Sequence, residues 1–466
     1  MALHLLHYAD LEVAHDDPEQ IGKLSGLVNE LSTSETIVCG SGDNIGPSVL
    51  SMISQGKQSL DFFQAVDADF DTFGNHDFDH GIEPLLDIVE DSPQTWACAN
   101  AIFDETRFSN NQEVVPWKVM KKGDDQIGII GVSHPNTAEI NPNASPVEFR
   151  DPIPAIESAV NELREREVDW IVVLSHLGED SQVARQTDVD VILGGHYHDP
   201  LVEHTEGTLI CRPGGTARNL LEVCVNEQAE ATLHDISDAA ENTTLTSKLR
   251  ERREVEGLDK VVGVVEEPII CDMMACKRGE SRIGNLITDA FRWKTSADIA
   301  ITSGGGFRRY PPLSGEVTAF DIVSVMPYRD DLLVIELEGT ELRQTLRNLS
   351  LSDSPADTPD WDFGHISGGS LVWDDAIGEL RSAKIDNSPI KPDQTYGIVT
   401  TEFNVDNNEL FPALKSGDVV RDGGPVHKAI IEYAETVDEY PNITGRIHRP
   451  ALNESDIPER DWPHNP

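Results

Sequence analysis

Short apolar runs that end directly at Asp, Asn or His are the feature that most constrains the fold of this chain. Four such runs lie in the first half, at residues 36–39, 70–73, 170–174 and 189–193. Runs of this length bounded by glycine-rich turns are typical of buried strands. Open α/β sheets bind their ligands at the carboxyl ends of strands. Together with the segment that ends at Asp10, five segments are therefore expected to deliver polar side chains to one edge.

Helical patterns alternate with these runs, which indicates the α/β class. Ile156, Ala159, Val160 and Leu163 follow the i, i+3, i+4, i+7 spacing of an amphipathic helix. The length of 466 residues favours two to three domains. Polar, helix-prone residues from about 228 to 263 indicate a connector, and the last residues are rich in proline. The predicted divisions are 1–227 (first domain), 228–263 (helical linker), 264–447 (second domain) and 448–466 (extended tail).

The net charge is extreme: 36 basic and 83 acidic residues give −47, spread along the whole chain. The repeated apolar strands exclude a disordered acidic protein. A surface for nucleic-acid polymers is not expected either, because phosphate would be repelled from nearly every face. Adaptation to high salt is the remaining interpretation, since at about 1 M salt the Debye length falls to about 3 Å and self-repulsion is screened.

The start of the chain and its cysteines both favour a reducing, cytoplasmic compartment. No apolar run reaches the roughly 18 residues that cross a membrane. The start lacks a basic segment and meets Asp10 early, so no signal peptide and a cytoplasmic location are expected. None of the six cysteines forms a CxxC pair. Buried thiols are favoured for Cys39 and Cys98, whereas a disulfide between Cys271 and Cys276 stays open.

The polar residues after the strands form a set that suits metal binding. It comprises Asp10, Glu12, Asp43, Asn75, His76, His176, His196 and His198. Carboxylate, carboxamide and imidazole groups suit Zn, Mn, Fe or Co better than a soft metal. Two metals about 3.5–4 Å apart need a bridging carboxylate, and Asp43 is the natural bridge. A single His after a strand is more often a capping or core residue, but ligands on five successive turns favour a metal site.

The motifs resemble those of calcineurin-like metallophosphoesterases in order and spacing. They read Asp10-Leu11-Glu12, Gly42-Asp43-Asn44, Gly74-Asn75-His76-Asp77-Phe78-Asp79, Ser175-His176 and Gly194-Gly195-His196-Tyr197-His198. The third motif is similar to that of the 5′-nucleotidase, UDP-sugar hydrolase and cyclic-phosphodiesterase family. The resemblance implies an N-terminal αββα sandwich and a C-terminal α/β substrate-binding domain.

The resemblance also implies roles for these residues and two divalent metal ions, whose identity (Mn, Zn, Co or Mg) stays open. Asp10, Glu12, Asp43 and His198 would surround one metal, and Asp43, Asn75, His176 and His196 the other. His76 would stabilise charge on the phosphate, oriented by Asp79. The family usually has D-x-H in the first motif, so Glu12 is a departure that leaves its role as a ligand open. His7 and His15 are possible substitutes, although His15 is expected on an exposed loop.

The second half extends the resemblance over nearly residues 3 to 447. The stretch from Cys276 to Ala290 is similar to the family's R-x-x-E-x-x-x-G-N-L-I-x-D-A element, with Lys277 or Arg278 in place of its first Arg. The Ser303–Arg308 loop is similar to N-G-G-G-I-R, which implies that Arg308 holds phosphate. Tyr328 and Phe403 would stack on a base, and Glu409 would bind ribose hydroxyls.

Hydrolysis of nucleoside 5′-monophosphates is the leading expectation, with cyclic nucleotides and nucleotide sugars as further candidate substrates. A thiosulfohydrolase shares the scaffold, but it has no use for a pair of base-stacking aromatics. A non-catalytic nucleotide or metal sensor would be expected to lack His76 or a bridging ligand. A nucleotide is the expected partner, without a nucleic-acid polymer or a membrane, and the oligomeric state is left open.

Overall fold

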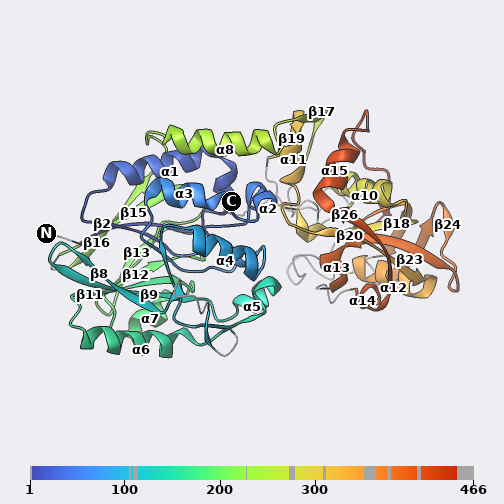
Figure 1. The fold of residues 1–466 in the computed structure, drawn as a ribbon. Coiled ribbons are helices and arrows are strands. Elements are labelled where there is room, and N and C mark those ends of the chain that lie inside the picture. Colours follow the sequence, from blue (N-terminus) through green and yellow to red (C-terminus); the bar gives the residue numbers. More distant parts are fainter. Residues whose placement is uncertain are drawn as a thin grey trace. The chain divides into compact units, whose positions relative to one another are not determined.

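The computed structural model describes most of the chain as two compact units, Met1–Glu256 and Gly257–Pro466 (Figure 1). The described residues are 3–103, 106–108, 114–226, 228–271, 276, 279–307, 311–350, 364–374, 379–406 and 411–448. Four of the predicted site residues lie outside these ranges: Lys277, Arg278, Arg308 and Glu409. Nearly all of the predicted tail also lies outside them.

Two sheets form the centre of the first unit. The seven-stranded sheet has the order β16-β15-β1-β2-β3-β4-β7, and the six-stranded sheet has the order β13-β14-β12-β11-β9-β8. The first sheet contains β1 (Leu3–Tyr8), β2 (Thr36–Gly40), β3 (Phe70–Asp71), β4 (Thr95–Ala97), β7 (Val114–Val115), β15 (Asn219–Val225) and β16 (Ala229–Asp235). The second contains β8 (Trp117–Lys122), β9 (Asp125–Ser133), β11 (Trp170–His176), β12 (Val191–Gly194), β13 (Leu201–Thr205) and β14 (Thr208–Arg212). In each sheet the central strands are parallel.

The two sheets pack face to face, and helices cover both outer faces. Leu5, Ile37 and Phe70 of the first sheet share a buried core with Ile129, Val172 and Leu193 of the second. Figure 1 shows α1 (Pro18–Leu31) and α8 (Thr243–Val255) along one side of this sandwich and α6 (Pro152–Glu165) along the opposite side. The expected αββα sandwich is therefore confirmed.

Helix α6 shows how the sequence specifies these outer layers. Asp151 accepts a hydrogen bond from the backbone N–H of Ile153, and Pro152 occupies the first turn, so the helix start is capped. The four apolar residues of the predicted stripe are the buried ones, namely Ile156, Ala159, Val160 and Leu163. They pack on β9 and β11 through Ile130, Val132 and Val173.

The prediction of a helical linker over 228–263 is wrong. Residues 229–235 form β16, which pairs antiparallel with β15 along its whole length, and α8 packs on α1 within the first unit. Both elements are polar because β16 is an edge strand with mostly exposed side chains and α8 buries only Leu245, Thr246 and Leu249. Composition alone does not separate such surface elements from a connector.

The second unit is a separate α/β domain, in agreement with the expectation. Its five-stranded sheet has the order β21-β18-β25-β20-β26, formed by β21 (Gly364–Ser367), β18 (Ile299–Ser303), β25 (Thr395–Thr401), β20 (Asp331–Glu338) and β26 (Asp418–Pro425). One buried core includes residues of α10 (Arg282–Thr295) and α15 (Val426–Ala434), and another includes residues of α12 (Gly339–Ser350) and α14 (Pro412–Ser416).

Cysteines and membrane segments complete the description. No disulfide joins any of the six cysteines in the described part of the chain, and this includes Cys271 and Cys276, for which a disulfide was left open. Cys39 and Cys98 are buried, as expected. Within the described part of the chain, no helix combines the length and apolar character that a membrane crossing requires.

Candidate metal centre

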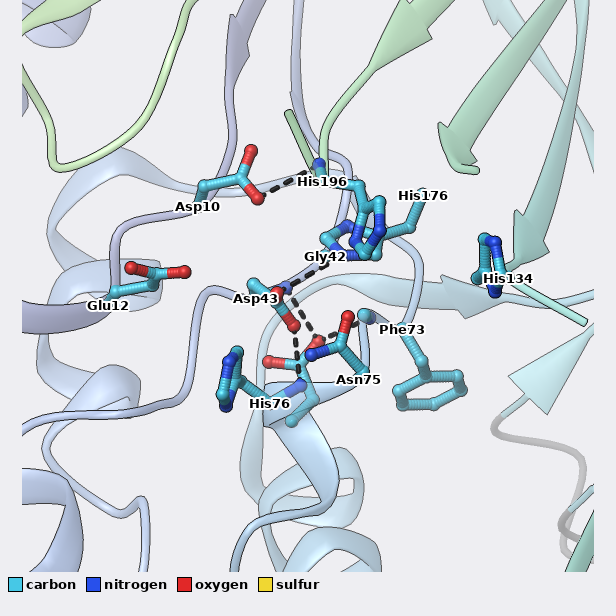
Figure 2. A network of polar contacts seen from close by, with 12 residues as sticks. Asp10, Glu12, Gly42, Asp43, Phe73, Asn75, His76, His134, His176 and His196 are labelled. Carbon is cyan, nitrogen blue, oxygen red and sulfur yellow. Dashed lines mark hydrogen bonds and ion pairs between the residues drawn. The ribbon is translucent and has the colours of Figure 1, made fainter. Parts of the chain in front are cut away.

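The predicted ligands meet where the parallel strands of both sheets end. Asp10 follows β1, Asp43 follows β2, and Asn75 and His76 follow β3. From the second sheet, His176 ends β11, and His196 and His198 follow β12. Figure 2 shows Asp43, Asn75, His176 and His196 converging, with Asp10 and Glu12 beside them. The structure thus brings the eight predicted metal-site residues to one edge of the sandwich.

Four of these residues have a backbone conformation that non-glycine residues rarely adopt. The φ angles are 50° at Asp10, 44° at Glu12, 53° at Asp43 and 71° at His196. Such left-handed residues cost free energy and persist where the surroundings hold them. Here the backbone N–H of Asp10 donates to Gly42 O at 3.1 Å, and that of His196 donates to Asp10 Oδ1 at 2.9 Å. Four of the thirteen non-glycine residues with positive φ in the described part of the chain are thus candidate ligands.

Asp43 lies at the middle of the centre. Its Oδ1 accepts a hydrogen bond from the backbone N–H of His76 at 2.7 Å, and its Oδ2 lies 3.1 Å from Nε2 of His176. Asp77 holds this loop by accepting hydrogen bonds from the backbone N–H groups of Asp43, Asn44, Ile45 and Gly74. Asp43 therefore has a fixed position between the two flanking groups of donors.

Besides the group of Glu12, Asp43 and His76, two groups of donors match the implied ligand sets. In one group, ligand atoms of Asp10, Glu12 and His198 lie within 4.8 Å of one another, and Glu12 Oε1 is 3.1 Å from His198 Nε2. In the other, Asp43, His176 and His196 meet the same distance limit. Glu12 thus lies among the donors, as its place in the first motif implied.

The histidines offered as substitutes for Glu12 are used elsewhere. His15 Nε2 bonds to the backbone carbonyl of Asn44 at 2.8 Å, and His7 Nε2 lies 2.7 Å from Ser41 Oγ. Both side chains are buried, so the expectation of an exposed His15 is wrong. Neither is among the metal-binding groups of described residues.

Three buried donor atoms of the centre have no hydrogen-bond partner among the described residues, and they provide a test of whether cations fit here. They are Asp10 Oδ2, Asn75 Oδ1 and His176 Nε2, the last of which makes an ion-pair contact with Asp43 Oδ2 at 3.1 Å that lacks hydrogen-bond geometry. An unsatisfied buried polar atom costs about 1–3 kcal/mol, so a cation bound between these donors would remove a cost to the folded chain. His176 donates the ring proton on Nδ1 to Ser41 O at 2.7 Å, so Nε2 is the atom that would bind a metal once the metal displaces its proton. The oxygen and nitrogen donors fit divalent cations.

The charges of the buried side chains also favour bound cations at this centre. Burial and the nearby carboxylates of Asp43 and Glu12 raise the pKa of Asp10 to about 7. Burial lowers the pKa of His176, but the Asp43 carboxylate outweighs it and raises that pKa to about 10. Three buried carboxylates in one place therefore favour positive charge nearby, and bound cations reverse the cost of ionising Asp10.

His76 stands at the rim of the centre, with its side chain 35% exposed. Its Nδ1 lies 3.2 Å from both carboxylate oxygens of Asp79. Although burial opposes the charged form, the Asp79 carboxylate raises the pKa of His76 well above its ordinary value. A protonated imidazole is thus held where it can contact an anion.

Sequence reasoning missed two residues around this centre. Asn141 donates through Nδ2 to Asn75 O and to Asp79 Oδ1, each at 2.8 Å, and so fixes both residues. The ring of His134 stacks on His196 with centroids 5.3 Å apart. Both follow β9, another parallel strand that ends at the same edge, so the strand-end rule that located His176 could have found this segment.

In the second unit, the structure describes three of the predicted substrate-binding residues. Ser303 ends β18 and is buried, Tyr328 is half-buried, and Phe403 in α13 (Glu402–Asp406) is 43% exposed. The backbone N–H of Phe403 donates to Asp330 Oδ1 at 3.2 Å, which ties the aromatic residue to the segment that carries Tyr328. The exposure of Phe403 is inconsistent with a core role.

Comparison with known proteins identifies the class. Residues 3–200 match the model of calcineurin-like phosphoesterases, and residues 261–416 match the 5′-nucleotidase C-terminal domain. The fold and the ligand groups accord with both matches. The chain is therefore a metallophosphoesterase, a phosphoric ester hydrolase. Its pair of domains places it in the 5′-nucleotidase family.

Individual relatives agree with this assignment. The 5′-nucleotidase precursor from Thermus thermophilus is 25% identical with a TM-score of 0.72, over 97% of this chain and 100% of that one. Endonuclease YhcR of Bacillus subtilis is 26% identical over 448 residues, covering 87% of this chain, which spans only 36% of that protein. The T. thermophilus sulfate thiohydrolase SoxB is 16% identical over 97% of each chain, with a TM-score of 0.62, and shares the fold.

Proposed function

We propose that this enzyme hydrolyses nucleoside 5′-monophosphates to nucleoside and phosphate, with two divalent cations bound around Asp43. The observation that carries the proposal is the set of buried donor atoms without partners among the described residues, Asp10 Oδ2, Asn75 Oδ1 and His176 Nε2. They come from the ends of three separate strands, β1, β3 and β11, and converge on one place where cations would satisfy them. The proposed bridge is Asp43, which belongs to one group with His176 and His196 and to another with Glu12 and His76.

Each cation has its own proposed ligands. One is held by Asp10, Glu12, Asp43 and His198, and the other by Asp43, Asn75, His176 and His196. When bound, such cations supply Lewis acidity toward the phosphate and make a water nucleophilic at neutral pH. Glu12 brings a hard carboxylate oxygen to the first position, which favours Mn or Mg there more than an imidazole would.

The proposed catalytic contribution of the chain itself comes from His76. Its imidazole, kept protonated by Asp79, faces the side where negative charge grows on the phosphoryl group and stabilises that charge by hydrogen bonding. Asn141 is a positioning residue, because it fixes the Asp79 carboxylate that orients His76. Neither His76 nor Asp79 belongs to the proposed sets of metal ligands, so their loss is expected to leave metal binding intact.

The proposed substrate class rests on the second unit. Tyr328 and the exposed Phe403 offer aromatic faces for a base, which is a stacking device that tolerates any base. Ser303, Arg308, Glu409 and either Lys277 or Arg278 are the remaining proposed substrate contacts. A thiosulfohydrolase activity shares the fold but leaves the exposed aromatic side chain without a use.

The test is phosphate release from a panel of substrates at multimolar KCl, with Mn²⁺, Zn²⁺, Co²⁺ or Mg²⁺ added to chelator-treated enzyme. The panel contains AMP, other nucleoside 5′-monophosphates, ADP, a cyclic nucleotide and p-nitrophenyl phosphate. We expect metal-dependent release that is fastest from 5′-monophosphates. Release from p-nitrophenyl phosphate alone, whatever the metal, would rule out the nucleotide assignment while leaving the phosphoesterase class intact.

A further inference from the structure

A second group of metal-binding donors lies on the first sheet, away from the catalytic centre. It consists of His4 in β1 and Glu222 and Cys224 in β15, which pair antiparallel. His4 is directly opposite Cys224 in the register, and Glu222 is two residues before it, so the three side chains share one face of the sheet. One ligand atom from each residue lies within 4.8 Å of the other two.

The group is supported by neighbours that orient its donors. His4 Nδ1 lies 2.8 Å from the hydroxyl of Thr36, which is buried, while its Nε2 lies 2.7 Å from Glu222 Oε1. The other carboxylate oxygen of Glu222 lies 2.7 Å from Nε2 of His234 in β16. Metal sites in proteins commonly have this construction, with the far side of each imidazole and carboxylate ligand held by a hydrogen bond.

A hydrogen-bonded chain of His4, Glu222 and His234 would account for the nitrogen and oxygen contacts. It gives no role to the sulfur of Cys224, which completes the group of donors. Part of the group is open to solvent, with the side chains of His4 and Glu222 14% and 24% exposed. A cation can therefore reach these donors without unfolding the sheet.

We propose that His4, Glu222 and Cys224 form a zinc-type site, with His234 orienting Glu222 and water as the fourth ligand. Imidazole, carboxylate and thiolate together are ligands of tetrahedral Zn²⁺, and the thiolate disfavours hard cations such as Mg²⁺. His4 lies near the start of β1 and Asp10 follows its end, on the order of 20 Å away by the rise of a strand, so this site is separate from the catalytic one. Its effect is to fasten β1, the strand that leads to Asp10, to β15.

The sulfur ligand makes the site testable beside the catalytic centre. Co²⁺ replaces Zn²⁺ in such sites, and a thiolate bound to Co²⁺ gives an intense charge-transfer band in the near ultraviolet that oxygen and nitrogen ligands do not give. The proposed catalytic ligands contain no sulfur. Titration of the metal-free, reduced full chain with Co²⁺ should therefore raise this band until one Co²⁺ per chain is bound to the thiolate.

Matched variants test whether the charge-transfer band comes from Cys224. Cys224→Ser should abolish it, whereas Cys98→Ser, a buried thiol outside the group, should retain it, as should Asp43→Ala at the catalytic centre. Glu222→Gln should weaken Co²⁺ binding at this band by about tenfold or more, with the circular dichroism spectrum unchanged. Absence of the band from the wild-type chain, or its persistence in Cys224→Ser, would overturn the proposal.

Discussion

His76 Nδ1 lies 3.2 Å from both oxygens of the Asp79 carboxylate, and this contact keeps the imidazole of His76 protonated at the rim of the metal centre. The contact is local, three residues apart in the chain, and Asn141 holds its carboxylate member from another loop. The Asp79 carboxylate makes the largest contribution to the raised pKa of His76, and the carboxylates of Asp43 and Glu12 add to it.

Replacing His76 should separate catalysis from metal binding. His76→Ala is expected to lower kcat by about two to three orders of magnitude with unchanged metal content, because the lost hydrogen bond acts on charge in the transition state. His76 stays protonated until the pH rises through its raised pKa, and activity is expected to fall above that pH. Asp79→Asn removes the largest cause of the raised pKa of His76. The alkaline limb of the profile of kcat against pH should therefore shift to lower pH in this variant. Asp87→Asn, an exposed carboxylate of α4 (Ile82–Asp91), is the matched control. An unchanged kcat in His76→Ala would remove this residue from the mechanism.

Glu12 should determine metal preference. Its carboxylate lies 3.1 Å from His198 Nε2 in one group of donors. Glu12→His exchanges a hard oxygen for an imidazole, so activation is expected to move from Mn²⁺ toward Zn²⁺. The measurement is the rate of AMP hydrolysis by metal-free enzyme reloaded with each cation. Identical activation profiles for the two proteins would place Glu12 outside the ligand shell.

The aromatic side chains of the second unit should act on the base. Phe403→Ala and Tyr328→Ala are each expected to raise KM for AMP, with stacking worth about 1–3 kcal/mol per base. Hydrolysis of p-nitrophenyl phosphate, which has no base, is the control and should change much less. If both substrates lose activity equally, the two rings support the fold and do not bind a base.

Salt should stabilise the folded chain. With a net charge of −47, unscreened repulsion opposes the compact state, and at multimolar KCl the screening length becomes shorter than the spacing of surface charges. The melting temperature, followed by circular dichroism from about 0.1 to 3 M KCl, is therefore expected to rise, and activity with it. A flat or falling melting temperature would refute the high-salt interpretation.

The sequence predicted the parts of this structure that depend on local pattern. The stripe of Ile156 and its partners predicted α6, and the polar residues after the strands predicted which candidate ligands of both sheets meet at one edge. The position of α6 follows from the spacing of its apolar side chains, and the positions of the candidate ligands follow from short motifs at the strand ends. The same strand-end rule was not applied after β9, so Asn141 and His134 were missed.

Other features depend on contacts between distant segments. His4 and Glu222 are 218 residues apart and meet only because β15 returns to pair with β1. By contrast, β16 pairs with its immediate neighbour β15, and it was missed because its exposed, polar side chains lack the apolar pattern of a strand. No short window of sequence contains the contact between His4 and Glu222.

The number of cations bound at Asp43 tests the central claim most directly. The measurement is elemental analysis of Mn²⁺ in chelator-treated, reloaded protein, performed in the Cys224→Ser background so that only the catalytic centre is counted. We predict two Mn²⁺ per chain when Asp43 is present, and loss of both, together with AMP hydrolysis, in Asp43→Ala, because its carboxylate is the shared ligand. Two Mn²⁺ per chain in Asp43→Ala would contradict the account.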